Sequence, residues 1–229
     1  SALGDYAVNT LQAKKIAVIH DGTAYGQGLA EEFKKAAIAA GAEIVKEEFT
    51  TDKAVDFTAI LTNIKASTPD LLFFGGMDPQ AAPMVQQMKK LGLSFPLIGG
   101  DGIRTPEFIK NAGPAANGMI GSTPGVELSS IASGQEFITR YGKQYGEIQL
   151  YAGYTYDAMM SVAEAMRMAQ STNPKVFIQK MGKIAYPGVT GTISFDSKGD
   201  VKGGAVTIYK VQNGKWVAVE TVKQSVSNM

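Results

Sequence analysis

The first half of the chain alternates short apolar runs with longer stretches whose apolar positions repeat at helical spacing. Residues 16–19 are apolar and rich in β-branched side chains, which is typical of a buried parallel strand. The chain then turns through residues 20–25, and a helix is expected over 26–40 because Gly41 suits a helix C-terminus. The predicted strands are 16–19, 43–49, 71–74, 96–98 and 119–122, and the predicted helices are 2–11, 26–40, 56–66, 80–91 and a short one from Pro106. This alternation predicts a parallel sheet covered by helices on both faces.

The pattern changes at Pro124. A Gly/Ser-rich stretch, 124–134, reads as a loop or crossover, and amphipathic helices are expected at 135–145, 151–169 and 174–182, with no strand between 125 and 187. Strands are expected again at 190–195, 205–211 and 215–222, where Asn213-Gly214 is a strong hairpin signal. The predicted fold class is therefore α/β: a three-layer parallel sheet, a helical segment and C-terminal antiparallel hairpin strands. The three helices either form a separate layer or cover a sheet that these residues do not supply.

Composition narrows the possible functions. The 229 residues carry a net charge of +1, so no strong field favours nucleic acid or an anionic membrane. The chain has no cysteine, which excludes disulfides, thiolate metal sites and cysteine nucleophiles. No apolar run approaches the ~18 residues of a membrane span. No basic and then apolar leader opens the sequence, which predicts a chain that is cytosolic, already processed or truncated.

The turns that follow the predicted strands hold the candidate site residues, because open α/β sheets bind ligands beyond the carboxyl ends of their strands. Asp21 and Tyr25 follow the first strand, Met77 the third and Asp101 the fourth. Asp101 lies between two glycines, so its carboxylate can either pair with a ligand cation or serve an ordinary turn, and spacing favours neither. The same two interpretations hold for Met77, and Asp21 is more readily a helix cap than a ligand group.

No motif supports catalysis or phosphate binding. The glycines within 22–28 lack the lysine of a phosphate-binding loop, and Glu31 stands where a dinucleotide fingerprint needs its last glycine. His20 is the single histidine, which excludes a multi-histidine metal site, and no G-x-S-x-G elbow is present. Trp216 is expected in packing. The pattern predicts a ligand-binding sheet edge, no enzyme activity and no cofactor.

Several long segments carry a resemblance to a known family. They are KKIAVIHDGTAYGQGLAEEFKKAAIAAGAEIV, DFTAILTNIKASTPDLLFFGGMDPQAAPMVQQMKKLG, LIGGDGIRTPEFI, LYAGYTYDAMMSVAEAM and GVTGTISFDSKGDVKGGAVTIYKVQNGKWV. In this order they resemble the periplasmic branched-chain amino-acid-binding proteins of ABC transporters, the leucine/isoleucine/valine-binding family. Such proteins are two-lobed clamshells of the type I class, in which each lobe is a flavodoxin-like α/β sheet.

The resemblance implies a division of this chain. Residues 1–122 are expected to form the second-lobe α/β domain, 123–188 a helical segment equivalent to later first-lobe helices, and 189–229 strands that return to the second lobe. The family's opening segment would precede Ser1, so the resemblance implies a truncated first lobe.

The resemblance also implies ligand contacts at four positions. Asp101 matches the acidic residue that pairs with the α-ammonium of the ligand, and Tyr25 matches an aromatic residue that touches the ligand. Tyr151 matches another aromatic residue near the side-chain pocket. Met77 stands where the better-known members have a tyrosine, so that contact is expected to differ. The groups that hold the α-carboxylate belong to the segment that the resemblance places before Ser1.

These expectations give one function and its alternatives. The chain is expected to be a non-enzymatic, periplasmic solute-binding protein from a branched-chain or aliphatic amino-acid uptake system, with permease subunits as partners and with weak or no amino-acid binding by this polypeptide. Self-association, for example as a domain-swapped dimer, is expected to bury the apolar helix faces. The alternatives are a flavodoxin-like nucleotide- or flavin-binding protein and the ligand-sensing domain of a receptor or regulator.

Overall fold

The computed structural model describes residues 1–148 and 150–223, so the last six positions of the range 189–229 lie outside the described residues. The chain divides into two compact units. The first comprises Ser1–Thr123 and Thr207–Val222, and the second comprises Pro124–Val206 with Lys223. Residues 189–206, which the sequence analysis grouped with the returning strands, therefore belong to the second unit.

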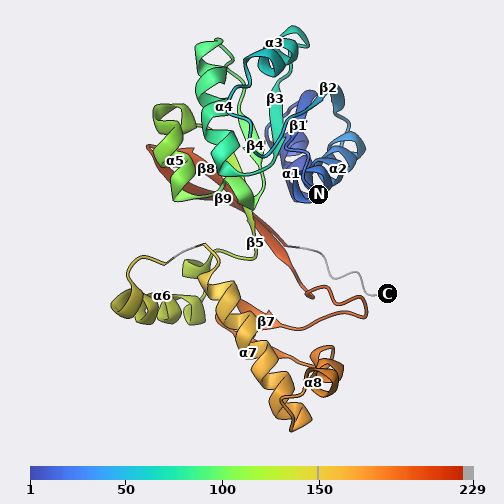
Figure 1. The fold of residues 1–229 in the computed structure, drawn as a ribbon, viewed down its shortest axis with the longest axis vertical. Helices are drawn as coiled ribbons and strands as arrows, with labels where there is room; N and C mark the ends of the chain where they lie inside the picture. Colours follow the sequence, from blue (N-terminus) through green and yellow to red (C-terminus); the bar gives the residue numbers. More distant parts are fainter. Residues whose placement is uncertain (149, 224–229) are drawn as a thin grey trace. The chain divides into compact units, whose positions relative to one another are not determined.

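A seven-stranded sheet forms the centre of the first unit, with strand order β2-β1-β3-β4-β5-β8-β9 (Figure 1). The strands are β1 (Lys15–His20), β2 (Glu43–Phe49), β3 (Leu71–Gly75), β4 (Leu97–Gly99), β5 (Ile120–Pro124), β8 (Ala205–Gln212) and β9 (Lys215–Lys223). The first five pair in parallel. Strand β8 lies beside β5, where Val211 N–H donates to Met119 O and Gly118 N–H donates to Val211 O, both over 2.9 Å. The predicted parallel sheet and its C-terminal hairpin are confirmed.

Helices cover both faces of this sheet, and each face has its own apolar core (Figure 1). The helices are α1 (Ala2–Asp5), the π-helical turn η1 (Tyr6–Thr10), α2 (Ala24–Ala39), α3 (Thr58–Ala66), α4 (Asp78–Lys90) and α5 (Pro106–Ala112). Helices α1 and α2 pack on one face, where Phe33 stacks on Phe73 with ring centroids 4.0 Å apart. Helices α3, α4 and α5 pack on the other face, around Leu61, Met84 and Phe108. Burial on both faces explains why the central strands β1 and β3 read as continuous apolar runs.

The second unit consists of short elements around one long helix. They are the 3-10 turn η4 (Leu128–Ser130), α6 (Ala132–Tyr145), α7 (Ala152–Ala169), α8 (Pro174–Met181), β6 (Tyr186–Gly188) and β7 (Gly191–Ile193). The two strands form their own antiparallel sheet. The prediction that no strand lies between residues 125 and 187 is wrong at its end, because β6 begins at Tyr186. The strand expected at 190–195 is shorter and does not join the large sheet.

Asp157 on α7 holds this small sheet in place. Its carboxylate accepts hydrogen bonds from Val189 N–H (2.8 Å), Thr190 N–H (2.8 Å) and the Thr190 hydroxyl (2.5 Å). The Asp157 side chain is buried, and the three donors supply the partners that a buried carboxylate requires.

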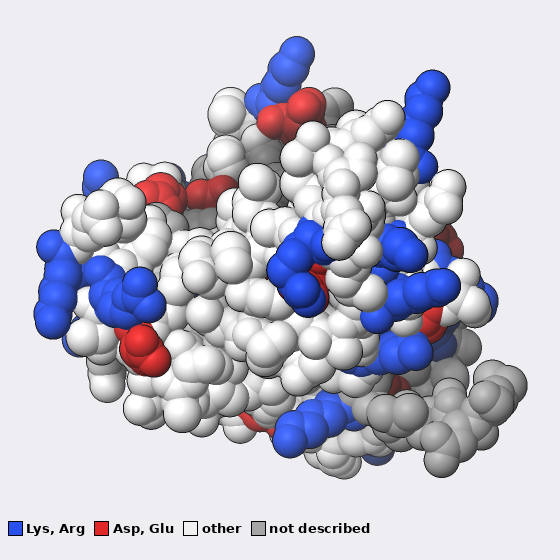
Figure 2. Space-filling model, turned by 90° about the horizontal axis from the view of Figure 1, so that it is seen from below, with Lys and Arg blue, Asp and Glu red and all other residues white. Residues whose placement is uncertain are grey.

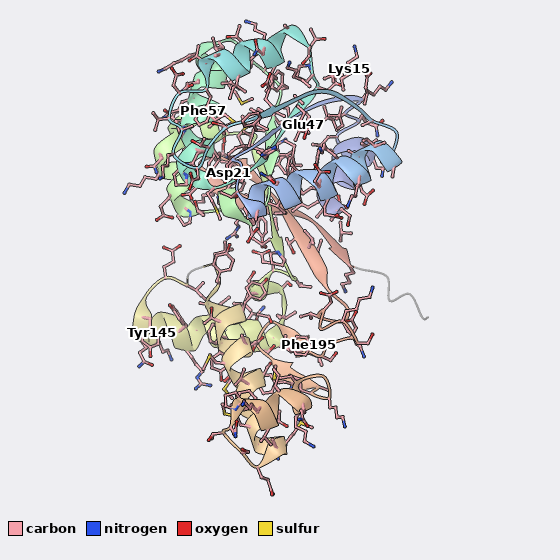
Figure 3. The ribbon with its side chains drawn as sticks, turned by 45° about the vertical axis from the view of Figure 1, so that its right-hand side comes forward. Lys15, Asp21, Glu47, Phe57, Tyr145 and Phe195 are labelled. Carbon is pink, nitrogen blue, oxygen red and sulfur yellow. The ribbon has the colours of Figure 1, made fainter. Side chains whose placement is uncertain are left out.

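The second unit has little apolar core of its own. Among its described residues, the buried hydrophobic residues are Ala165, Ile184 and Ala205. Large apolar side chains are exposed instead, including Tyr145 (66%), Met159 (66%) and Ile178 (60%), and Figure 3 labels Tyr145 at the end of α6. This is the pattern expected of amphipathic helices that lack a surface to cover.

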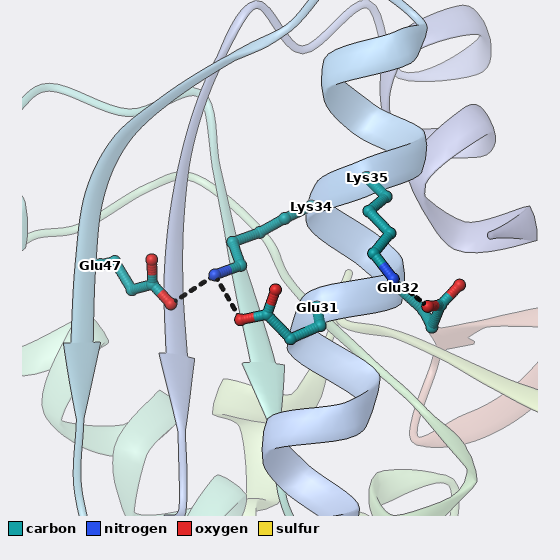
Figure 4. A network of polar contacts seen from close by, with 5 residues as sticks. All are labelled: Glu31, Glu32, Lys34, Lys35 and Glu47. Carbon is teal, nitrogen blue, oxygen red and sulfur yellow. Dashed lines mark hydrogen bonds and ion pairs between the residues drawn. The ribbon is translucent and has the colours of Figure 1, made fainter.

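Charged side chains of both signs are spread over the surface. Lys34 on α2 lies between Glu31 Oε1 (2.8 Å) and Glu47 Oε1 (2.7 Å), which ties the helix to strand β2 (Figure 4). Seen from below, blue and red groups are separated by broad uncharged areas (Figure 2).

In the described part of the chain, no helix combines the length and the apolar character needed to cross a bilayer.

Candidate functional site

Two of the predicted site residues meet directly at the carboxyl edge of the large sheet. The Tyr25 hydroxyl donates a hydrogen bond to Asp101 Oδ1 over 2.8 Å, and the Tyr25 hydroxyl oxygen accepts one from Gly102 N–H over 3.0 Å. Asp101 begins the 3-10 turn η2 (Asp101–Ile103) after β4, and Tyr25 lies in the first turn of α2. The predicted turn at 20–25 ended too late, because α2 begins at Ala24.

Met77 belongs to the same cluster. A Cβ atom placed on Gly102 would lie 2.7 Å from Met77 Sδ, 2.7 Å from Gly76 O and 3.0 Å from the Tyr25 hydroxyl. The glycine at position 102 is therefore what allows these groups to approach the turn so closely. Met77 is 42% exposed, whereas Tyr25 and Asp101 are half-buried. The cluster thus presents a carboxylate, a phenol and a thioether at one edge of the sheet.

The segment after Asp101 is fixed by helix α5. The Thr105 hydroxyl accepts from Phe108 N–H over 3.0 Å and donates to Asp78 Oδ2 over 3.1 Å, so it caps α5 and links it to the start of α4. Trp216 Nε1–H donates to Thr105 O over 2.9 Å, and its ring stacks on Phe108 with centroids 5.6 Å apart. Trp216 is therefore a packing residue, as predicted.

Asp21 stabilises the turn before α2, although the cap itself is Thr23. Asp21 Oδ1 accepts from Thr23 N–H (2.9 Å) and from the Thr23 hydroxyl (2.6 Å), and Thr23 Oγ1 accepts from Gly26 N–H (3.0 Å). Asp21 is 3% exposed and lies beside the start of α2 (Figure 3). The Asp21 carboxylate beside this helix N-terminus would repel a phosphate, and Thr23 Oγ1 already accepts the Gly26 N–H, so the turn does not favour a nucleotide.

The fourth predicted residue, Tyr151, belongs to the second unit, whereas Tyr25, Met77 and Asp101 belong to the first. It precedes α7, and its carbonyl oxygen accepts a hydrogen bond from Thr155 N–H over 2.8 Å. The Tyr151 residue is 48% exposed.

Arg104 is a residue of this edge that the sequence analysis missed. Its guanidinium carbon lies 4.1 Å from the centre of the Tyr209 ring, and its backbone N–H donates to Asp101 O over 3.1 Å. An arginine three residues after a glycine-flanked aspartate was visible in the sequence. Its partner Tyr209 was not predictable, because Tyr209 comes from β8 near the end of the chain.

Comparison with known proteins gives one consistent family. Residues 1–215 match the family model described as periplasmic binding protein. The Leu/Ile/Val-binding protein homolog 1 of Brucella suis is 34% identical over 212 residues, which cover 92% of this chain and 57% of that protein. An amino acid binding protein of Pseudomonas aeruginosa is 34% identical over 208 residues, which cover 90% of this chain and 56% of that protein. The chain thus spans a little more than half the length of these relatives.

Solved structures agree with this assignment. A leucine-binding protein LivK from Thermotoga maritima superposes with a TM-score of 0.90 and 26% identity, covering 96% of this chain and 64% of that one. The substrate-binding protein LivJ from Streptococcus pneumoniae, solved in complex with isoleucine, has a TM-score of 0.82 and 26% identity over 97% of this chain and 64% of that one. Since the family model matches nearly the whole chain and the fold agrees, this protein belongs to the periplasmic binding protein family.

Proposed function

We propose that this chain supplies one side of an amino-acid binding site and that Asp101 pairs with the α-ammonium group of the ligand. The observation that carries the proposal is the carboxylate of Asp101 at the carboxyl edge of the sheet, fixed by the Tyr25 hydroxyl. A carboxylate held in this way forms a charge-assisted hydrogen bond with an ammonium group without first having to be ordered.

The apolar neighbour of Asp101 favours an aliphatic ligand. Met77 Sδ packs against Gly102, and an adaptable thioether contacts branched aliphatic side chains well. The relatives named above as Leu/Ile/Val-binding, and the solved relative in complex with isoleucine, support the same class of ligand. Tyr151 is proposed as a further contact near the ligand side chain.

The wider role proposed is that of a non-enzymatic solute-binding protein in the periplasm, which delivers an amino acid to the permease subunits of an ABC transporter. The names of the relatives support amino-acid binding, and the solved relative described as the substrate-binding protein of a branched-chain amino acid transporter supports a role in transport. Closure of two lobes around the ligand would generate the form that a permease recognises.

Weak or absent amino-acid binding is proposed for the 229-residue polypeptide by itself. The resemblance assigns the groups that hold the α-carboxylate to a segment outside these residues, so half of the ligand's polar contacts are not supplied here. Asp101 contributes a single charged contact, and one such contact is too little for tight binding.

Calorimetric titration of the polypeptide with leucine, and an NMR titration that follows the Gly102 amide, test the proposal. We expect no heat at micromolar leucine and a saturable shift of the Gly102 amide at millimolar leucine. The shift should disappear in Asp101→Asn and persist in the control Asp200→Asn, an exposed position of the second unit. Micromolar binding would overturn the weak-binding proposal, and an unchanged shift in Asp101→Asn would overturn the role of Asp101.

A further inference from the structure

Four dipeptides of the chain place an aspartate or asparagine directly before a glycine. They are Asp21-Gly22, Asp101-Gly102, Asn117-Gly118 and Asn213-Gly214. In such a pair the backbone nitrogen of the glycine can attack the side-chain carbonyl carbon of the residue before it, because glycine has no Cβ to obstruct the approach. The product is a five-membered succinimide ring, which water opens to aspartate or isoaspartate. The reaction requires that the glycine nitrogen be able to leave its place in the fold.

Hydrogen bonds hold the glycine nitrogen in three of these pairs. The acceptors are His20 Nδ1 for Gly22 (3.2 Å), the Tyr25 hydroxyl oxygen for Gly102 (3.0 Å) and Val211 O for Gly118 (2.9 Å). A planar amide nitrogen that donates in this way has to give up its bond and its proton before it can attack. The Gly118 bond joins the residue pair that precedes β5 to β8, so it opens only when this part of the sheet opens.

The Gly214 nitrogen is not held in this way. No hydrogen bond from Gly214 N–H occurs among residues 1–148 and 150–223. Asn213 and Gly214 are exposed at the tip of the β8–β9 hairpin, and their φ angles of 51° and 73° are typical of the central residues of a type I′ turn. A Cβ atom placed on Gly214 would meet no atom within 4 Å. The tip can therefore change conformation without opening the sheet behind it.

Asn117-Gly118 gives a matched comparison within the same molecule. It has the same two residue types, Asn117 is exposed like Asn213, and Gly118 has a φ of 84°. The two pairs differ in the φ of the asparagine, −62° against 51°, and in the hydrogen bond of the glycine nitrogen. Residue type and exposure alone would predict equal reactivity for the two asparagines, whereas the hydrogen bond predicts that Asn213 reacts and Asn117 does not.

We propose that Asn213 is a site of spontaneous deamidation and that hydrogen bonds of the glycine nitrogen protect the other three pairs. At Asn213 the Gly214 nitrogen loses its proton and bonds to Cγ, and the side-chain nitrogen leaves as ammonia. Water then adds to either carbonyl of the ring and gives aspartate or isoaspartate. The only co-reactant is water, and the product carries one negative charge more than the parent, beside Lys215. None of these steps involves the amino-acid ligand.

The same rule gives Tyr25 a protective role at Asp101. The Tyr25 hydroxyl donates to Asp101 Oδ1 and accepts from Gly102 N–H, so one oxygen holds both groups that would have to react with each other. Without the hydroxyl, the Gly102 nitrogen can attack the Asp101 side chain, whose carboxyl group then loses water to form the ring. Ring opening by water leaves isoaspartate at a position that the proposed function requires to be aspartate.

Peptide mapping by mass spectrometry, after incubation of the polypeptide at neutral pH and physiological temperature, tests the proposal. Deamidation is read from the increase in peptide mass. We expect Asn213 to be lost at least about tenfold faster than Asn117, the effect of a modest difference in activation barrier. In denaturant the two asparagines should react at similar rates, because the hydrogen bond of Gly118 is then absent. A native protein in which Asn213 reacts no faster than Asn117 would overturn the proposal.

Substitution of each asparagine assigns the charge change. Asn213→Gly keeps a residue that accepts positive φ and removes the reactive amide, so the acidic species that accumulates on isoelectric focusing should disappear. Asn117→Gly is the matched control and should leave that species in place. Persistence of the acidic species in Asn213→Gly would show that another residue is modified.

Tyr25→Phe tests the protection of Asp101. Isoaspartate at position 101 should form at least about fivefold faster than in the wild type, while Tyr145→Phe should match the wild type. Asn117 in the same digest reports folding, because it should stay intact only while β5 and β8 are paired. If Asn117 is intact and no additional isoaspartate forms at position 101, Tyr25 does not protect Asp101. If Tyr25→Phe fails to fold, the comparison of Asn213 with Asn117 in the wild type decides the proposal.

Discussion

The Tyr25 hydroxyl and the Asp101 carboxylate form a 2.8 Å hydrogen bond that joins the first turn of α2 to the turn after β4. The same hydroxyl accepts the Gly102 N–H over 3.0 Å, so one phenolic oxygen fixes both the side chain and the backbone of that turn. The orientation of Asp101 therefore depends on a residue far from it in sequence.

Tyr25→Phe should loosen this turn while leaving the aromatic ring in place. The Gly102 N–H loses its acceptor, which costs about 1 kcal/mol, so hydrogen exchange of the Gly102 amide should accelerate about fivefold. Tyr145→Phe, at an exposed position of the second unit, is the control and should leave this amide unchanged. Unaltered Gly102 protection in Tyr25→Phe would mean that the hydroxyl does not hold the turn.

Two glycines of α2 should respond to alanine in opposite ways. A Cβ on Gly26 would overlap Asp21 Oδ1 and Gly75 O, whereas a Cβ on Gly28 meets no atom within 4 Å. We expect Gly26→Ala to lower the free energy of unfolding by about 2–3 kcal/mol through overpacking. Gly28→Ala should raise it by up to about 1 kcal/mol, because alanine favours the helix. Denaturant unfolding of both variants tests the pair, and similar midpoints would contradict the close approach of α2 to β3.

Asp70 should make the first unit sensitive to acid. Backbone hydrogen bonds from Lys15 and Lys14, each 2.9 Å long, hold the pKa of the Asp70 carboxyl below its usual value. Because the pKa is lowered on folding, the stabilisation is present above the unfolded pKa of about 3.9 and is lost as the pH falls through the folded pKa.

Asp70→Asn should therefore cost about 1 kcal/mol near neutral pH, a modest amount because the side chain is exposed. The difference from the wild type should shrink below about pH 4. Unfolding midpoints measured across this pH range, with Asp5→Asn on α1 as the exposed control, test this. A difference that grows on acidification would have the wrong sign and would refute the account.

The β6–β7 turn should depend on Asp157. Gly188 packs directly against the Asp157 carboxylate, so a Cβ on Gly188 would overlap it, whereas a Cβ on Gly182 meets no atom within 4 Å. Asp157→Asn replaces one acceptor oxygen by an amide NH₂ that faces donors, and should cost about 2–3 kcal/mol. Gly188→Ala should also expose the Val189 and Thr190 amides to rapid exchange, while Gly182→Ala should not. Retained protection in Gly188→Ala would show that the turn is held by other contacts.

Self-association through the second unit is expected from its exposed apolar side chains. Met159 and Ile178 are 66% and 60% exposed, and burying such side chains gains roughly 25 cal/mol for each Å² of apolar surface. Met159→Glu with Ile178→Glu should therefore shift the mass measured by light scattering toward the monomer. Ile38→Glu on α2, whose side chain is 57% exposed, is the control and should not. A wild type that is monomeric at high concentration would contradict this prediction.

The sequence predicted those parts of the fold that depend on local patterns. Asn213 and Gly214 both have positive φ, 51° and 73°, as the Asn-Gly hairpin signal requires. Ile16 to Ile19 are fully buried, as their apolar run indicated. Strands β6 and β7 were harder to predict, because each has three residues and they contain Pro187, Gly188 and Gly191, which weaken any strand signal.

The candidate site was predictable only in part, because local sequence patterns do not show which distant residues come into contact. Turn positions place Tyr25, Met77 and Asp101 at one edge of the sheet without further information. The hydrogen bond between Tyr25 and Asp101, and the stacking of Arg104 on Tyr209, join residues that are distant in sequence. Side-chain packing across strands decides such pairs, and no local pattern encodes it.

The position of β8 beside β5 has a consequence for a nicked molecule. Every residue of α6, α7 and α8 lies between these two neighbouring strands in sequence, yet Met119 and Val211 share a backbone hydrogen bond. After a single proteolytic cut in one of those helices, the two fragments should therefore stay associated through the backbone hydrogen bonds between β5 and β8 and through the apolar cores that both fragments share. They should migrate together in buffer and separate only in denaturant, which makes the pair a natural split protein whose halves can be expressed apart and recombined.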